Sequence, residues 1–226
     1  MKKLTGAVVL FTALCGTTGV AGEAGTSVVK LGTASVSYNN NSTELSGDFT
    51  PPGVTAVAED HNVAAFMYDY FVTDNWSVQL AAGLPPTVKL SAAGTGADLG
   101  QVGEAKAMFP AVIALYNIDL SNKFSAYIGA GVNYTKFVDS KIYDSYETAF
   151  GGESEGKIED SVGGVFKIGG SYAVNDNWMV DVAYARHWIT ADAKVTTSTP
   201  GIGDVERSIS VDVDPDIISF AVGYKF

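Results

Sequence analysis

Two histidines, His61 and His187, are the side chains with which this chain could carry out acid–base or nucleophilic chemistry. Lipid-modifying hydrolases and acyltransferases pair such a histidine with a nucleophile or a carboxylate within hydrogen-bond reach. His187 stands between Arg186 and Trp188, and no serine lies in the next few positions. We therefore expect both histidines to be structural or interfacial, and we expect no enzyme activity.

Three charged residues interrupt stretches that are otherwise rich in apolar side chains. Asp69, Lys167 and Asp181 each stand where the alternation of their neighbours predicts the inner side of a β-strand. A buried charge is costly unless it is paired, so we expect Lys167 to form an internal salt bridge with Asp69 or Asp181. Substrate binding is the alternative role. The residues predicted to face the same lumen are Gln79, Ala81, Asn133, Ala185 and His187.

No metal or cofactor site is predicted. The segment 139–160 is acidic, and its carboxylates could bind divalent cations, which prefer oxygen ligands. The spacing matches no calcium-binding loop, so we expect a solvated loop. Gly129-Ala130-Gly131 begins like a dinucleotide-binding motif, but it lacks the third glycine and a following helix. The carboxylates of the acidic segment are Asp144, Glu147, Glu153, Glu155 and Glu159.

Three similar turns organise the strands that carry these residues. Thr73-Asp74-Asn75-Trp76 and Asn175-Asp176-Asn177-Trp178 share one pattern, and Ser121-Asn122-Lys123-Phe124 is a looser copy. Asn and Asp adopt tight-turn conformations readily, so each copy predicts a short hairpin. Apolar residues recur at every second position on both sides of each turn, which is the period of a strand.

The aromatic residue that ends each turn lies on the apolar face of the following strand. Trp76, Phe124 and Trp178 are therefore predicted to form an aromatic girdle at one membrane interface, where amphipathic rings are favoured. The alternative is that aromatic residues simply follow hairpin turns, as in other β-proteins.

The three hairpins supply six strands, and a first strand near 28–38 and a last strand near 217–226 bring the number to about eight. Lys30 interrupts the alternation of the first strand, so its register stays open. Four long polar segments separate the hairpins. This asymmetry predicts an all-β fold, an eight-stranded antiparallel transmembrane β-barrel with short periplasmic turns and long extracellular loops. The long segments lie near 39–60, 87–108, 137–160 and 190–208.

The C-terminal strand has an apolar stripe that includes Ile218 and ends at the last residue. On an open sheet edge such an aromatic stripe would invite aggregation. A closed barrel removes the edge and turns the stripe towards lipid, so we expect this strand to pair with the first. Its aromatic end also resembles the signal that the outer-membrane assembly machinery reads. The residues of the predicted signal are Phe220, Val222, Tyr224 and Phe226.

The N-terminus predicts secretion. Lys2 and Lys3 precede a short apolar run, which is followed by small residues suited to cleavage after Ala21 or Ala24. We therefore predict a cleaved signal peptide over 1–21 and a single barrel domain over 22–226. The run is too short to span a membrane as a helix. The one cysteine, Cys15, lies within it, and lipidation there is a minor alternative.

Composition excludes two other classes of protein. With 25 acidic and 14 basic residues the chain carries a net charge of −11, so nucleic acid is not an expected partner. Hydrophobic residues make up 46% of the chain, which is too many for ordinary acidic disorder.

Several segments together resemble the outer membrane protein W family. They are the run from Lys123 to Thr135, the turn Thr73-Asp74-Asn75, the segment Asp160-Ser161-Val162-Gly163, Asp214-Pro215, and the ending Gly223-Tyr224-Lys225-Phe226. The resemblance extends over essentially the whole mature chain. It implies an eight-stranded barrel in a Gram-negative outer membrane, with a narrow lumen associated with passage of small hydrophobic compounds.

We therefore expect a passive conduit for a small hydrophobic ligand. Small residues such as Ala81, Gly83, Ala183 and Ala185 would leave room for it, and it could exit sideways between strands. The alternative is a non-conducting surface barrel for adhesion, receptor recognition or envelope stability, and a plugged lumen would favour that role. The expected partners are the outer membrane, lipopolysaccharide and the barrel assembly machinery, and we expect a monomer.

Overall fold

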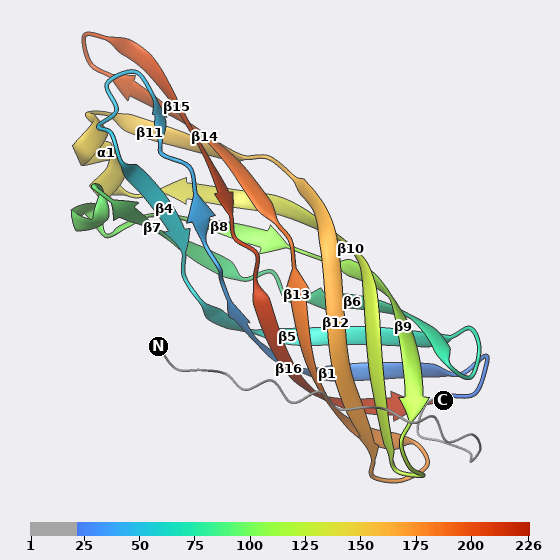
Figure 1. The fold of residues 1–226 in the computed structure, drawn as a ribbon. Helices are drawn as coiled ribbons and strands as arrows, with labels where there is room; N and C mark the ends of the chain where they lie inside the picture. Colours follow the sequence, from blue (N-terminus) through green and yellow to red (C-terminus); the bar gives the residue numbers. More distant parts are fainter. Residues whose placement is uncertain (1–21) are drawn as a thin grey trace, which may run out of the picture.

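The predicted strands are present in the computed structural model, which describes residues 22–226, and eight of them form one antiparallel sheet that closes on itself (Figure 1). The predicted signal segment 1–21, with Cys15 and Ala21, lies outside the described residues. The barrel strands are β1 (Ser27–Ser37), β5 (His61–Phe71), β6 (Trp76–Gly83), β9 (Ala111–Asp119), β10 (Phe124–Ile142), β12 (Ser161–Ala173), β13 (Trp178–His187) and β16 (Asp216–Lys225).

Each barrel strand pairs with its neighbour in chain order, and the ends of the sheet meet. β1 pairs with β5 on one side and with β16 on the other, so that Val29 lies opposite both Tyr68 and Tyr224. The pairing of β10 with β12 joins the two halves of the sheet. The prediction that the first and last strands pair is therefore confirmed, and the edge of β16 is covered.

The three short turns share one hydrogen-bond pattern. In each, the side-chain oxygen of the first turn residue accepts a hydrogen bond from the backbone N–H of the aromatic residue three positions later. This bond closes the turn and fixes where the next strand begins. The pairs are Thr73 Oγ1 with Trp76 at 3.0 Å, Ser121 Oγ with Phe124 at 3.1 Å and Asn175 Oδ1 with Trp178 at 2.9 Å.

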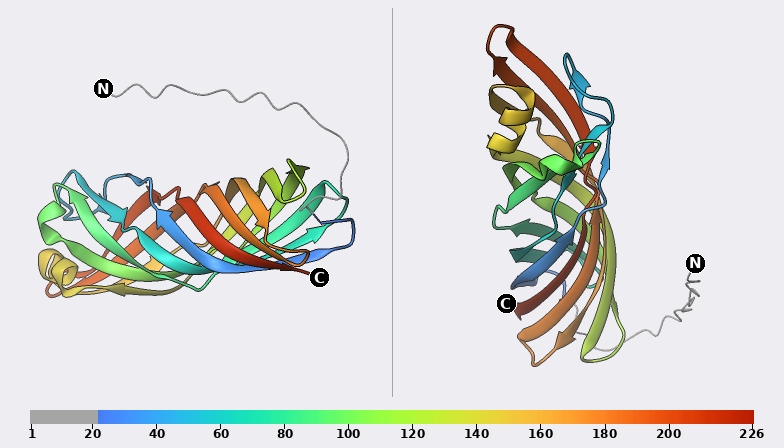
Figure 2. Two further views of the ribbon diagram at one scale, coloured as in Figure 1. Left: turned by 90° about the horizontal axis from the view of Figure 1, so that it is seen from below. Right: turned by 90° about the vertical axis from the view of Figure 1, so that its left-hand side faces the viewer.

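The four long segments connect the barrel strands at the end opposite the short turns, as predicted, but they are not irregular. They contain ordered strands that extend the barrel beyond its outer end (Figures 1 and 2). The extension consists of β2 (Asn41–Ser42), β3 (Ser46–Gly47), β4 (Val54–Ala58), β7 (Thr87–Gly94), the 3-10 helix η1 (Ala97–Leu99), β8 (Gln101–Met108), α1 (Asp144–Phe150), β11 (Glu153–Ile158), β14 (Thr190–Thr199) and β15 (Gly203–Asp212).

Two small sheets make up this extension. β8 pairs with the outer part of β10, and β7 and β4 follow. On the other side β14 pairs with β11 and β15, and β2 and β3 add short bridges to β15. Figure 1 shows these hairpins and α1 gathered at the end opposite the C-terminus. Within residues 22–226, neither helix has the length and apolarity needed to cross a membrane.

The core changes character along the axis of the molecule. Near the short turns the interior of the barrel is filled by charged and polar side chains, and beside them lies an apolar cluster that contains Ile113, Leu115 and Val165. The extension has its own apolar core, in which Val88, Ile189 and other aliphatic residues are buried. The barrel and the extension therefore present two different environments to a molecule that enters from outside.

Candidate functional site

A cluster of buried polar side chains fills the barrel near its short turns, and Lys30 on β1 lies at its centre. The Lys30 Nζ atom is 2.9 Å from Oδ2 of Asp69 on β5 and 2.9 Å from Oδ2 of Asp181 on β13. All three side chains are at most 4% exposed. Ser171 also donates a hydrogen bond to Asp181 Oδ2 at 2.6 Å. One cation thus holds two carboxylates from different strands.

Gln79 and Lys167 complete this inner polar cluster. The Gln79 amide nitrogen donates to Asp69 Oδ1 at 2.5 Å, and its oxygen accepts from Lys167 Nζ at 2.6 Å. Lys167 Nζ also lies 3.3 Å from the sulfur of Met67. The expected salt bridge between Lys167 and Asp69 or Asp181 is therefore wrong. Lys30, whose register the sequence left open, forms ion pairs with both carboxylates instead.

Tyr127, a residue of β10, closes the inner polar cluster. Its hydroxyl donates to Asp181 Oδ1 at 2.9 Å, and the ring lies 5.0 Å from Lys30 Nζ and 5.9 Å from Lys167 Nζ. The ring passes over Gly169, where a Cβ would come within 2.5 Å of it. Gly169 is therefore needed for the position of Tyr127. With this ring in place the cluster blocks the lumen towards the short turns.

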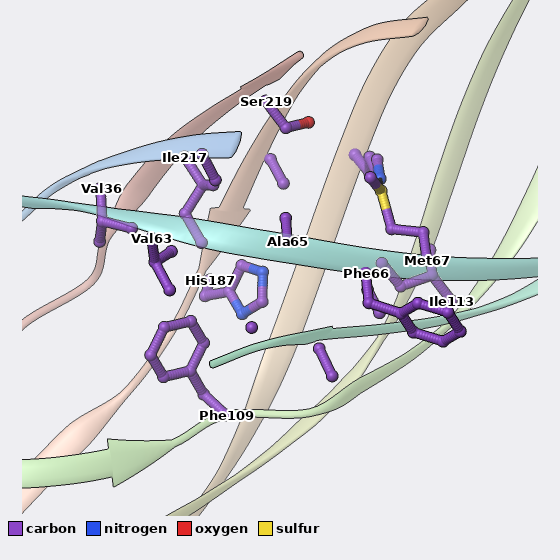
Figure 3. Close-up of a pocket in the computed structure, with 16 residues that line it drawn as sticks. Val36, Val63, Ala65, Phe66, Met67, Phe109, Ile113, His187, Ile217 and Ser219 are labelled. Carbon is purple, nitrogen blue, oxygen red and sulfur yellow. Dashed lines mark hydrogen bonds between the residues drawn. The ribbon is translucent and has the colours of Figure 1, made fainter. Parts of the chain in front are cut away.

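Beyond the cluster, an open pocket of about 60 Å³ lies at the wall of the barrel (Figure 3). We call it the lateral pocket. Inward-facing Met67, Ile113 and His187 line it, but so do Phe66 and Ala82, which are exposed on the outer face. The pocket therefore lies at the wall between the lumen and the exterior. Its other lining residues are Ala34, Val36, Val63, Ala65, Ala81, Gly83, Phe109, Lys167, Ala185, Ile217 and Ser219.

The pocket coincides with an interruption of the sheet. β6 pairs with β9 as far as Ala81 and Ala111. Among the described residues, the next backbone hydrogen bond between the two segments runs from Ala107 N to Pro86 O at 3.3 Å. Proline has no N–H with which to continue a ladder, and prolines occupy 85, 86 and 110. We call this stretch, in which residues 82–85 are not paired with residues 108–110, the wall gap.

A second, more apolar cavity of about 80 Å³ lies inside the extension. We call it the outer cavity. Val88, Ile189 and Val211 are among its walls, and Tyr38 lies at its edge with a phenol whose pKa is raised above its usual value by burial. Phe109 lines both the outer cavity and the lateral pocket. Its ring meets that of His187 edge-on, with centroids 6.4 Å apart. Phe109 therefore separates the two spaces.

The residues predicted to face the lumen lie inside the barrel but form three groups. Asp69, Gln79, Lys167 and Asp181 meet in the inner polar cluster. Ala81, Ala185 and His187 line the lateral pocket, together with Lys167. Asn133 belongs to neither group, since its amide donates to the backbone oxygen of Gly164 at 3.0 Å. Gly83 also lines the lateral pocket, whereas Ala183 is packed in the apolar cluster.

The outer face carries the predicted aromatic residues. Trp76, Phe124 and Trp178 are each between 43% and 50% exposed, and Trp178 packs against Tyr224 with centroids 5.0 Å apart. Phe220, Val222, Tyr224 and Phe226 are exposed on the same face of β16. The orientation is the one that lipid contact requires, while their roles as girdle and assembly signal stay predictions.

Hydrogen bonds organise the polar part of the extension. Ser91 and Gln101 donate to the Glu59 carboxylate at 2.7 and 2.9 Å and lower the pKa of Glu59. Tyr143 donates to Glu104 at 2.8 Å, which raises the pKa of its phenol. The acidic segment forms α1 and β11 and not an irregular loop, while Asp144, Glu153, Glu155 and Glu159 are exposed to solvent as expected. In the described part of the chain its carboxylates join no group of three that could hold a metal ion.

Comparison with known proteins agrees with this architecture. The model of the OmpW family matches residues 23–226. The chain belongs to the OmpW family. Outer membrane protein W of Escherichia coli is 31% identical over the full length of both chains. A protein of Pseudomonas aeruginosa named dibenzothiophene metabolism operon protein PahQ is 28% identical over 87% of each chain.

The fold of this OmpW-family chain is also found in a solved structure. The crystal structure of the outer membrane protein OprG from Pseudomonas aeruginosa superposes with a TM-score of 0.80 and 26% identity, covering 90% of this chain and 97% of OprG. The predicted fold and the predicted location in a bacterial outer membrane are thus confirmed.

Sequence reasoning did not predict Lys30, Tyr127, Ser171 or Phe109 as residues of this OmpW-family site. Lys30 shares its parity with buried Val28, Ala34 and Val36, and that agreement was the available signal that it faces inward. Phe109 stood at the end of what was taken for a loop. Pro110 after it, and two prolines at 85 and 86, were the signal that strand pairing breaks there.

Proposed function

We propose that this barrel lets small hydrophobic molecules cross the outer membrane barrier by leaving sideways through its wall. A molecule enters the outer cavity, passes Phe109, reaches the lateral pocket and moves through the wall gap into the hydrophobic layer of the membrane. The inner polar cluster stops it from continuing through the lumen. Water and ions are stopped at the same place, because the cluster and Tyr127 occupy the lumen.

The observation that carries the proposal is the position of Phe109 between two apolar spaces. One space lies outside the membrane in the extension, and the other reaches the lipid-facing residues Phe66 and Ala82. Small side chains at Ala65, Ala81 and Gly83 keep this part of the wall thin. The name of the relative PahQ, a dibenzothiophene metabolism operon protein, refers to an apolar aromatic compound and supports a hydrophobic cargo.

The experiment compares two substitutions on the outer face of the barrel. Ala82→Trp places a large ring at the lateral pocket, while Ala64→Trp places the same ring on the lipid-facing side of β5 away from it. Uptake of n-octane and naphthalene is measured in cells with each variant and in cells without the protein. We expect Ala82→Trp to reduce uptake to the level without protein and Ala64→Trp to leave it unchanged. Equal uptake by all cells would contradict the proposal.

The second candidate function is a non-conducting surface barrel, and the inner polar cluster is the observation in its favour. A lumen blocked by buried charges and an ordered extension would serve adhesion, receptor recognition or envelope stability equally well. Such a barrel would give no protein-dependent uptake, but its loss would change surface binding or envelope resistance. The same set of cells therefore separates the two functions.

Catalysis is not part of the proposed function. Within residues 22–226, no side-chain hydrogen bond joins His61 or His187 to a serine or a carboxylate, and His187 Nδ1 is buried without a partner. Replacing both histidines with alanine should leave lipid A chemistry of the cell unchanged.

Lipopolysaccharide and the barrel assembly machinery are the proposed partners, and we propose a monomer. The exposed stripe that ends at Phe226 supports recognition by the assembly machinery, and deletion of Phe226 should lower the amount of folded protein in the membrane.

Signal cleavage after Ala21 is favoured over cleavage after Ala24, because the backbone N–H of Ala24 donates to Asp74 at 2.9 Å and that of Gly25 donates to Phe71 O at 2.8 Å. N-terminal mass spectrometry distinguishes these sites.

A further inference from the structure

His187 brings an unsatisfied polar atom into the lateral pocket. The residue is 5% exposed, and its Nδ1 atom has no hydrogen-bond partner among the described residues. Figure 3 shows the imidazole projecting into the space near Val63 and Phe109. A buried polar group without a partner costs about 1–3 kcal/mol, so this nitrogen is suited to a guest that can bond to it.

Lys167 lies next to His187 on the inner wall. On the paired strands β12 and β13, Lys167 is opposite Ala185, and His187 is opposite Val165. The two side chains are therefore diagonal neighbours on one face, roughly 7–8 Å apart at their backbones. Both side chains line the lateral pocket, so a guest in it can contact both of them.

The ammonium group of Lys167 retains donor capacity. It donates to Gln79 Oε1 and contacts the Met67 sulfur, and a lysine has three N–H donors. The two carboxylates of the inner polar cluster are both held by Lys30. Two lysines and two aspartates already balance, so an anionic guest would add an uncompensated buried charge.

The remaining surroundings are apolar. Besides Lys167 and His187, the only polar side chain that lines the lateral pocket among the described residues is that of Ser219. The pocket has a volume of about 60 Å³. It has room for a polar head group and the carbons next to it, while a longer tail would extend past Phe66 and Ala82 towards lipid.

We propose that the lateral pocket binds the hydroxyl group of an otherwise apolar molecule, an alcohol or a phenol, between Lys167 Nζ and His187 Nδ1. This inference rests on the proposed function and names the class of molecule it favours. A hydroxyl both accepts and donates, so it can accept from Lys167 and bond to Nδ1 in either histidine tautomer. A pure hydrocarbon forms no hydrogen bond with either nitrogen.

The test is an NMR titration of the full-length barrel in lipid nanodiscs with 15N-labelled histidine rings. The probes are 1-octanol, n-octane and octanoate. We expect 1-octanol to shift the His187 ring signals while n-octane leaves them in place, and the His61 signals serve as an internal control. An unchanged His187 signal, or equal shifts with n-octane, would overturn the proposal. A larger shift with octanoate would overturn the assignment to hydroxyl groups.

Uptake by cells gives the second readout. His187→Phe keeps a planar ring without nitrogen, and we expect it to lower uptake of 1-octanol about fivefold relative to n-octane, the factor for one hydrogen bond. His187→Asn restores a polar atom at the δ position and should recover most of this ratio. Variants are compared at equal amounts of folded protein. If His187→Phe lowers uptake of both compounds equally, the hydroxyl site is wrong while conduction stands. If neither compound enters faster with the protein than without it, the proposed conduction fails.

Discussion

The ammonium nitrogen of Lys30 lies 2.9 Å from Oδ2 of Asp181, although 151 positions separate the two residues in the chain. Lys30 stands on the first barrel strand and Asp181 on the seventh, with the last strand between them. Lys30 also contacts Asp69 on the second strand, so the ion cluster spans the place where the first and last strands meet. The seam where the barrel closes is therefore held by a buried ion cluster as well as by backbone pairing.

Replacing Lys30 with methionine tests the energetic role of this cluster. Lys30→Met keeps most of the length of the side chain but leaves Asp69 and Asp181 without their shared cation. Removal of one partner from a buried ion pair typically costs 3–5 kcal/mol. We expect a loss of about that size in the free energy of unfolding, measured by urea titration in lipid vesicles.

A matched neutral variant provides the control for this prediction. Lys30→Met combined with Asp181→Asn removes one charge of each sign and leaves buried Lys167 and Asp69 to balance each other, and we expect it to recover most of the lost stability. Lys106 and Asp139 form an exposed pair at 3.5 Å, and Lys106→Met should change stability by less than about 1 kcal/mol. Equal losses for the buried and the exposed lysine would contradict the role of the cluster.

The barrel itself could be predicted from the sequence because the patterns that specify it lie within single strands and turns. A strand in lipid places apolar residues at every second position, and turn residues such as Asn175 and Thr73 mark where strands end. The sequence could not show which cation pairs with Asp181, since that choice depends on contacts across 151 positions. It could not show the ordered extension either, because the apolar positions there face a cavity in water and not a lipid surface.

Phe109 provides a prediction about the path between the two cavities. Phe109→Ala should raise uptake of naphthalene, and Phe109→Trp should lower it, because the ring stands where both spaces meet. A change of about 1.4 kcal/mol in the barrier gives tenfold in rate, and we expect effects on that order. Phe137 lines the outer cavity but not the lateral pocket, so Phe137→Ala is the matched control and should change uptake little. If the two alanine variants behave alike, Phe109 is not the gate.

The hydrogen bonds to Glu59 predict that the stability of the extension depends on pH. Ser91 and Gln101 stabilise the ionised carboxylate and lower the pKa of Glu59 in the folded state. Such a group stabilises the fold above its unfolded pKa of about 4.3, and the contribution is lost as the pH falls through the lower folded value. Because the site is near the surface, we expect Glu59→Gln to cost less than about 1 kcal/mol at pH 7.

The same comparison at a series of falling pH values supplies the check. As the pH falls through the lowered folded pKa of Glu59, the wild-type carboxyl becomes protonated, so the difference in unfolding free energy between wild type and Glu59→Gln should shrink. Ser91→Ala removes the first of the two donors and should make the Glu59→Gln effect smaller at pH 7. A difference that persists unchanged across this series would mean that the ionised form of Glu59 contributes nothing.

The contacts of Arg207 indicate what stabilises the outermost part of the extension. The residue is 2% exposed, its Nε and Nη1 atoms donate at 3.1 Å to Thr50 and Thr197, and its guanidinium lies 4.5 Å from the centre of the Phe150 ring. Hydrogen bonds from a charged group contribute about 1.5–3 kcal/mol, and a buried cation over an aromatic ring about 2 kcal/mol. Arg207→Met keeps the apolar contact but removes both of these interactions.

We expect this loss to appear locally in α1, which carries Phe150, and not in the barrel. Hydrogen exchange of the Gly151 and Gly152 amides, which donate to Glu147 O, should accelerate by roughly 30-fold or more in Arg207→Met, as a local loss of about 2 kcal/mol predicts. Arg186 pairs with Asp216 on the barrel at 3.2 Å, so Arg186→Met should leave these amides unchanged. Faster exchange throughout β12 and β13 in Arg207→Met would instead place Arg207 in the global stability of the barrel, because local opening of α1 exposes no barrel strand.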